Sequence, residues 1–352
     1  MKKLKKLVIF ISLILLITTG CGNKKKIREK ANLDLNFDDD YYRIATPYKE
    51  GVGHNYVVNN TLNNYDSSEV ESSLMDISTN YFSTKSYKYQ EGQYLKEKDL
   101  KKLLDREHLN KSDSILVDGI TINPTYISYI HEQNYLNNNG DLKGVSIALV
   151  LNPYQAYKNE NGNYLYKEID EKKVLDFGVD ASKKLLKHLR SIDKLKNTDI
   201  LIGLYIQSNP ESALPGSFRK VGNTSTSNIS FNSINYTYQY LNSSYVSEHD
   251  TSSYTAFENM KNNVIKDNAN TYLSGKGLYY NNKLKSLDIT VTCTYSNKSK
   301  LIMLSQLISD EIVSSFGSSP SVKVNVKVNN ETYAFINKSK GSTRTKIYIM
   351  KG

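Results

Sequence analysis

Residues 144–151 read Gly-Val-Ser-Ile-Ala-Leu-Val-Leu, an apolar run without a charged side chain. Such a run is typical of a β-strand that is buried on both faces. A second run, Ile-Leu-Ile-Gly-Leu-Tyr-Ile, spans residues 200–206. The segment between them, 170–192, carries apolar side chains at helical spacing, namely Val174, Phe177, Ala181, Leu185, Leu186 and Leu189. The sequence therefore predicts two buried strands joined by an amphipathic helix.

The region before residue 144 is predicted to start with an extended segment over 42–47 and a helix over 66–82. Asp66 is a suitable N-cap residue, and Glu69 three positions later completes a capping-box pattern. An aromatic strand is predicted over 86–95. A mixed helical and loop stretch then leads to the first buried strand.

The region after residue 225 is predicted to follow a similar succession. The predicted elements are a strand over 229–240, a helix over 253–273, a strand over 284–295, a helix over 300–316, a strand over 322–328, and a hairpin of 330–336 with 345–350. Two halves, 41–225 and 226–352, would then share a β-α-β-β-α-β order. An internal duplication would produce this order, although the halves share little sequence identity. With or without a duplication, the fold class is α+β, with mixed sheets and helices packed on them.

The chain has two cysteines, Cys21 and Cys293. Residues 288–295 alternate like a strand, and Cys293 shares a predicted face with Ile289 and Val291. We expect Cys293 to be a small buried apolar side chain rather than a catalytic thiol.

The first twenty residues have the pattern of a secretory signal peptide. Lysines at 2, 3, 5 and 6 precede an apolar run over 7–17, and Thr18-Thr19-Gly20 follows it. About twenty apolar residues are needed to span a bilayer, so this run is too short for a lasting transmembrane helix. Cleavage is expected between Gly20 and Cys21.

Thr18 to Cys21 resemble the lipobox of bacterial lipoproteins, although Thr18 stands where leucine is usual. The resemblance implies that lipoprotein diacylglyceryl transferase modifies Cys21 with palmitate-type chains and that signal peptidase II then cleaves before it. The protein would be lipid-anchored on the extracellular face of the cell membrane. An ordinary secretion signal with Cys21 as a chance neighbour is the alternative.

The net charge of +10 is concentrated near the N-terminus. The four signal lysines and the basic cluster at 24–30 account for +8, so residues 31–352 carry only +2. A nearly neutral body gives no electrostatic footprint for nucleic acid, and we expect none to bind. Residues 21–40 are predicted to be a flexible spacer, whose basic cluster either lies against anionic lipid or serves as a polar spacer.

Motifs for catalysis, cofactor binding or metal binding are lacking in the sequence. It contains no P-loop, dinucleotide-binding fingerprint, His-Glu-x-x-His motif or paired-cysteine spacing. The five histidines are scattered, and His188 is predicted to lie on a solvated helix face. We therefore expect no enzyme activity, no cofactor and no metal site.

Two segments are candidates for ligand contact. The glycine loop 51–55 follows an extended segment and could approach a ligand closely, although a simple turn is the preferred interpretation. Gln90, Glu91, Gln93 and Tyr94 place polar groups among aromatic ones. A sugar- or peptide-binding groove would use such residues, and a half-exposed sheet edge would as well.

Several segments resemble the CamS family, the sex-pheromone lipoproteins of Gram-positive bacteria. They are Gln90–Leu95, Asn123-Pro124, Ile130–Gln133, Tyr135-Leu136, Ile202–Tyr205, Leu214–Gly216 and Gly275–Tyr279. The resemblance extends from the signal peptide to residue 350. It implies a surface lipoprotein whose cleaved signal peptide is trimmed, in some members, into a short hydrophobic mating pheromone.

The stretch corresponding to that peptide is Ile14 to Gly20, which lacks the alanine-rich ending expected of an active pheromone. Our first hypothesis is a CamS-type lipoprotein with a non-catalytic binding or structural ectodomain of unknown ligand. The alternative is a lipoprotein that binds a solute or cell-wall fragment. A third hypothesis, an envelope hydrolase using Glu91, lacks a partner carboxylate at readable spacing.

Overall fold

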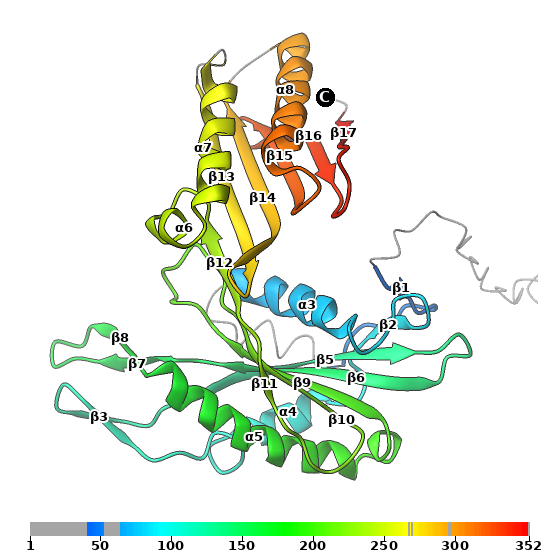
Figure 1. Cartoon of the computed structure of the whole chain (residues 1–352). Coiled ribbons are helices and arrows are strands. Elements are labelled where there is room, and N and C mark those ends of the chain that lie inside the picture. Colours follow the sequence, from blue (N-terminus) through cyan, green and yellow to red (C-terminus); the bar gives the residue numbers. More distant parts are fainter. Residues whose placement is uncertain (1–40, 53–63, 267, 269, 295–296, 351–352) are drawn as a thin grey trace, which may run out of the picture. The chain divides into compact units, whose positions relative to one another are not determined.

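The computed structural model describes residues 41–52, 64–266, 268, 270–294 and 297–350 (Figure 1). The predicted signal peptide, Gly20, Cys21, the spacer to residue 40 and Tyr295 lie outside the described residues. The described residues from Tyr42 onward belong to one compact unit, Tyr42–Gly352. Within the described part, no helix has both the length and the apolar character needed to cross a membrane.

The first sheet has seven strands in the order β1-β2-β5-β6-β9-β10-β11. Their bounds are β1 Arg43–Ile44, β2 Lys88–Glu91, β5 Ile127–Leu136, β6 Leu142–Leu151, β9 Asp199–Ile206, β10 Ser217–Thr224 and β11 Asn232–Ser233. The central strands β6 and β9 run parallel, and each has an antiparallel partner, β5 or β10. Two separate hairpins pair β3 (Ile115–Val117) with β4 (Ile120–Ile122), and β7 (Tyr154–Lys158) with β8 (Tyr164–Glu168).

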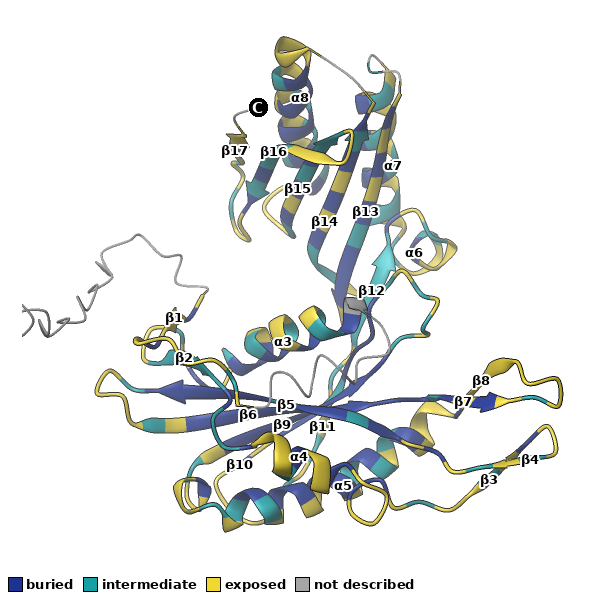
Figure 2. Ribbon diagram, turned by 180° about the vertical axis from the view of Figure 1, so that it is seen from behind, coloured by how far each residue is buried: buried dark blue, intermediate teal, exposed yellow. Residues whose placement is uncertain are grey.

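Helices cover both faces of this sheet (Figure 1). Helix α3 (Asn64–Ser78) packs on one face, while α4 (Glu97–Leu103) and α5 (Glu171–Ser191) pack on the other. On β6, Ile147 and Leu149 belong to the core beneath α5, whereas Ala148 and Val150 face α3. Figure 2 shows the resulting buried centre of the sheet. The predicted strand buried on both faces is therefore confirmed, as is its parallel partner over 200–206.

The second sheet has six strands in the order β12-β13-β14-β15-β16-β17. They are β12 Tyr236–Tyr240, β13 Thr271–Tyr280, β14 Lys283–Cys293, β15 Ser321–Val328, β16 Glu331–Lys338 and β17 Lys346–Ile349. Helices α6 (Ser244–His249), α7 (Thr251–Lys266) and α8 (Lys298–Phe316) complete this part. Helices α7 and α8 bury one face of the sheet, and Cys293 lies in that core with 5% of its surface exposed. The predicted burial of Cys293 and the predicted C-terminal hairpin are confirmed.

The two sheets repeat one order of elements. The first runs β1-α3-β5-β6-α5-β9, with β2, α4, β3, β4, β7 and β8 inserted, and the second runs β12-α7-β13-β14-α8-β15, with α6 inserted. In both, a hairpin is followed by a helix and a strand parallel to the hairpin's second strand. This is an α+β fold with the β-α-β-β-α-β order that the sequence suggested.

The predicted capping role of Asp66 is wrong. Helix α3 already includes Asn64, so Asp66 lies in its first turn, fully buried, and accepts hydrogen bonds from the β9–β10 region. The helix ends at Ser78 rather than at residue 82, because turns follow from Thr79 onward.

Two predictions in the second half are also wrong. The strand predicted over 229–240 is two short strands in different sheets, β11 and β12. The helix predicted over 253–273 stops at Lys266, and β13 begins at Thr271 after Asn270 adopts a left-handed backbone with φ 63°. In the first half of the chain, strand β5 was not predicted, because its central sequence, His-Glu-Gln-Asn, is polar.

Candidate functional site

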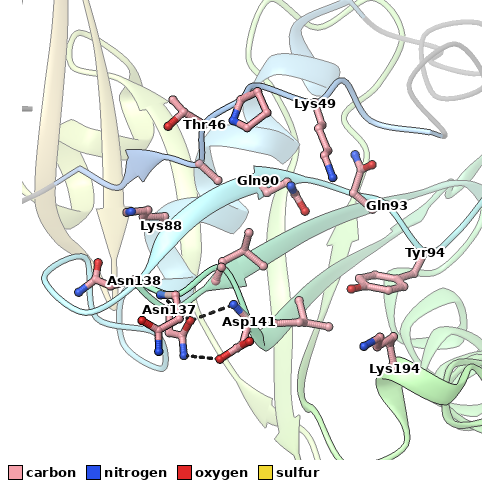
Figure 3. A pocket seen from close by; sticks show the side chains of 16 residues that line it. Thr46, Lys49, Lys88, Gln90, Gln93, Tyr94, Asn137, Asn138, Asp141 and Lys194 are labelled. Atoms are coloured by element: carbon pink, nitrogen blue, oxygen red, sulfur yellow. Dashed lines mark hydrogen bonds between the residues drawn. The ribbon is translucent and has the colours of Figure 1, made fainter. Parts of the chain in front are cut away.

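A groove with a volume of about 630 Å³ lies beside strand β2 of the first sheet (Figure 3). Its lining residues, called here the β2 groove, are Ala45, Thr46, Pro47, Lys49, Lys88, Gln90, Gln93, Tyr94, Leu136, Asn137, Asn138, Asn139, Gly140, Asp141, Leu142 and Lys194. Figure 3 shows Thr46 and Lys49 on one side, the hairpin of Asn137 to Asp141 on the other, and Gln90 between them. The volume lies within the usual range of small-ligand sites.

The segment 93–95, which brings Gln93 and Tyr94 to the groove, is fixed by one buried carboxylate. The Glu132 oxygens accept hydrogen bonds from the backbone N–H groups of Gln93 (2.9 Å), Tyr94 (3.1 Å) and Leu95 (2.7 Å). Burial raises the pKa of Glu132, and these three donors oppose that shift. Gly92 permits the close approach, since a Cβ there would lie 2.6 Å from the Glu132 Cβ. The hydrogen bonds of Glu132 therefore join two segments that are separate in the sequence, 90–95 and 130–133.

The opposite wall is the tight turn between β5 and β6. The side-chain oxygen of Asn137 accepts hydrogen bonds from the N–H groups of Asn139 (3.0 Å) and Asp141 (2.9 Å). Its amide nitrogen donates to Asp141 Oδ2 over 3.0 Å, and Gly140 has a left-handed φ of 87°. The turn is therefore held by its own side chains and presents amide groups to the groove.

The groove carries an excess of positive charge. Lys49, Lys88 and Lys194 line it, and none of the three forms an ion pair with any residue that the structure describes. Asp141 is its one lining carboxylate among the described residues, and it is engaged by Asn137. Burial, with a smaller contribution from nearby Glu132, raises the pKa of the Tyr94 hydroxyl, so this group stays a neutral donor at physiological pH. The arrangement suits a polar ligand with negative or hydroxyl groups.

Of the four residues proposed for ligand contact, the structure brings three to the groove. Gln90, Gln93 and Tyr94 line it, whereas Glu91 does not. Glu91 accepts a hydrogen bond from Gly51 N over 2.5 Å and another from the Tyr48 hydroxyl. That bond to Glu91 is the main reason why the pKa of Tyr48 rises to about 12.

The described part of the glycine loop thus docks on β2 through Glu91. Val52 N also donates to Gly92 O over 3.0 Å. The rest of the loop, including His54, lies outside the described residues. These contacts give Glu91 structural partners, and neither of them supplies the second carboxylate that glycoside hydrolysis requires.

Three features of the β2 groove were not predicted from the sequence, namely its three lysines, Glu132 behind it, and the turn at 137–141. The Asn-Asn-Asn-Gly-Asp sequence over 137–141 is a readable turn signal and could have located that wall. The three lysines come from separate elements, and only the fold shows that they converge. The described residues contain no group of three or more histidine, cysteine, aspartate or glutamate side chains arranged for a metal ion.

Comparison with known proteins identifies the family. Residues 48–344 match the family model described as CamS sex pheromone cAM373 precursor. A crystal structure of a sex pheromone precursor from Lactobacillus salivarius subsp. salivarius UCC118 is 26% identical, covers 90% of this chain and 95% of its own, and superimposes with a TM-score of 0.76. The C-terminal domain of the sex pheromone staph-cAM373 precursor from Staphylococcus aureus has the same fold, at 24% identity and TM-score 0.73, covering 83% of this chain and 99% of its own. No curated protein matches the sequence.

Proposed function

Because the chain belongs to the CamS sex pheromone precursor family, we propose that it is a surface lipoprotein anchored to the cell membrane through lipid on Cys21. The signal-like residues 1–20 and the following cysteine support the proposal. The compact unit that begins at Tyr42 starts some twenty residues after Cys21, and we propose that the intervening residues tether it to the membrane. Lipoprotein diacylglyceryl transferase and signal peptidase II would act on the precursor.

The released signal peptide is the proposed source of the pheromone. Cleavage before Cys21 would liberate a fragment ending in Ile14-Leu-Leu-Ile-Thr-Thr-Gly20, and trimming would leave a short hydrophobic peptide. The relatives' descriptions as sex pheromone precursors support this role. The fragment ends in Thr-Thr-Gly rather than in an alanine-rich sequence, so the activity of the peptide on recipient cells has to be measured separately.

Replacing Cys21 with alanine should abolish lipid attachment, because no other residue supplies a thiol near the cleavage site. We expect intact-mass analysis of the purified protein to show diacylglyceryl addition in the wild type and none in Cys21→Ala. The matched control is Cys293→Ala, which alters the buried cysteine and should keep the lipid. A lipid-modified Cys21→Ala protein would contradict the anchor.

We propose a non-catalytic binding role for the ectodomain, centred on the β2 groove. Three lysine ammonium groups line the β2 groove and have no ion-pair partner among the described residues. Side-chain amides and the Tyr94 ring line the same groove, and this combination supports the proposal. Ammonium and amide donors favour carboxylates and hydroxyls, and an aromatic ring can stack on a sugar face. A carboxylate-bearing cell-wall fragment has this chemistry.

A double substitution in the groove should weaken such binding. For the mature protein in neutral detergent, we expect a muropeptide to raise the unfolding temperature through mass action. Lys88→Gln combined with Lys194→Gln should weaken the affinity by about tenfold, which corresponds to losing ~1.4 kcal/mol of interaction. Lys323→Gln with Lys327→Gln on β15, outside the groove, is the control. No temperature shift with wild-type protein would count against the groove, while the lipid anchor would be unaffected.

A further inference from the structure

A second hollow, separate from the β2 groove, lies between α4, the loop after it and α5. Its volume is about 590 Å³. Its lining, called here the α4–α5 hollow, consists of Asp99, Lys102, Leu103, Glu107, His108, Leu109, Lys111, Lys184, Lys187, His188 and Ser191. No residue is shared with the β2 groove. Figure 1 shows α4 and α5 on the same face of the first sheet, and Figure 2 shows their exposed outer sides.

The two α5 lysines of the hollow, Lys184 and Lys187, differ from two other lysines of the same helix. On α5, Lys172 pairs with Asp176 and Lys183 pairs with Asp180, at 2.7 and 2.9 Å. Lys184 and Lys187 face the hollow and have no carboxylate within ion-pair distance among the described residues. The same holds for Lys102 and Lys111 on the other wall. Four lysines from two walls thus converge unpaired, with Asp99 and Glu107 as the opposing charges.

The apolar floor and the remaining polar groups of the α4–α5 hollow indicate which class of ligand it could bind. Leu103 and Leu109, 6% and 2% exposed, give the hollow an apolar floor that can contact carbon chains. His108 Nδ1 lies 2.6 Å from Asp105 Oδ1, which orients the ring beside the opening. Lysine ammonium groups bind phosphate as point charges, without demanding a planar partner. Cationic walls above an apolar floor match a chain of phosphates joined by short aliphatic units.

We propose that the α4–α5 hollow binds a phosphodiester-linked polyol, such as a poly(glycerol phosphate) segment of the cell envelope. The positive groups line a concave volume rather than a flat face, so a chain can enter it while a bilayer surface cannot reach its floor. Residues 31–352 carry a net charge of only +2, so the four lysines around this hollow are a local concentration of positive charge on a nearly neutral protein.

The test is a titration of the lipidated full-length mature protein, held in neutral detergent micelles, with a synthetic oligo(glycerol phosphate). We expect saturable binding that weakens as salt is raised. Lys184→Gln combined with Lys187→Gln should raise the Kd about tenfold, because two ammonium–phosphate contacts are lost. The control pair, Lys172→Gln with Lys183→Gln, removes the same charge from the same helix outside the hollow and should leave the Kd unchanged.

Three results would overturn the proposal. They are the absence of oligomer binding at low salt, equal weakening in both double variants, and binding of micelles doped with phosphatidylglycerol without binding of the soluble oligomer. The last result would assign the lysines to a lipid surface. Circular dichroism and the unfolding temperature confirm that each variant is folded, since all four substitutions lie at exposed positions.

Discussion

Glu132→Ala should lower the free energy of unfolding by about 3 kcal/mol, a large effect for one substitution. The wild-type carboxylate accepts three backbone N–H groups from residues 93–95, and alanine leaves those donors without a partner in a buried place. Removing a buried charge offsets part of this cost, since burial raises the pKa of Glu132. The measurement is urea unfolding followed by circular dichroism.

Two further variants test whether the loss of stability comes from the missing hydrogen bonds of Glu132 or from the cavity that alanine leaves. Glu132→Gln keeps one acceptor oxygen and should lose about half as much stability as Glu132→Ala. Glu160→Ala removes an exposed carboxylate in the turn between β7 and β8 and should change stability by less than about 0.5 kcal/mol. A loss below about 1 kcal/mol for Glu132→Ala would show that the 93–95 segment is held by other contacts.

Asp66→Ala should cost about 2 kcal/mol, because it leaves donors from β9 and the β9–β10 loop unsatisfied. Asp66 accepts hydrogen bonds from the Tyr205 hydroxyl (2.7 Å), Gly216 N (2.7 Å) and Ser208 N (3.3 Å). It thereby ties the first turn of α3 to the sheet. Asp113→Ala, at an exposed position, is the control and should be nearly neutral.

The contribution of Asp66 should also depend on pH. Burial raises its pKa more than the three hydrogen bonds lower it, so the folded state holds the proton more tightly than the unfolded state. Its stabilising contribution is therefore full below the unfolded pKa and is lost as the pH rises through the folded pKa. The stability advantage of wild type over the non-titrating Asp66→Asn should shrink as the pH rises from below the unfolded pKa of about 3.9 through the raised folded pKa. An advantage that grows over this range would mean that the hydrogen bonds outweigh burial.

The parts of the fold that could be predicted from sequence are those with a strong single periodicity. The apolar runs at 144–151 and 200–206 and the helical stripe of α5 specify buried strands and a covering helix without ambiguity. Strand β5 could not be found this way, because its buried Glu132, Gln133 and Asn134 read as solvent-exposed residues. Their burial depends on hydrogen-bond partners far away in the chain, and no local pattern shows these.

The candidate sites divide in the same way. Gln90, Gln93 and Tyr94 could be selected because polar groups among aromatic ones in one short segment are a local signal, although β2 ends at Glu91. Glu91 belongs to the same signal but turns to Gly51, and its direction is set by an element forty residues away. The lysines of both hollows come from different elements, so only the tertiary structure distinguishes them from the many lysines on the surface.

Mass spectrometry of culture filtrate for peptides within residues 11–20, comparing wild type with Cys21→Ala, tests whether the precursor is lipidated and cleaved before Cys21. We expect a peptide ending at or just before Gly20 in the wild type and no such peptide in Cys21→Ala, because cleavage before the cysteine requires its lipid. A wild-type filtrate without any such peptide, or the same peptide from Cys21→Ala, would contradict the claim that this chain is processed as a pheromone-precursor lipoprotein.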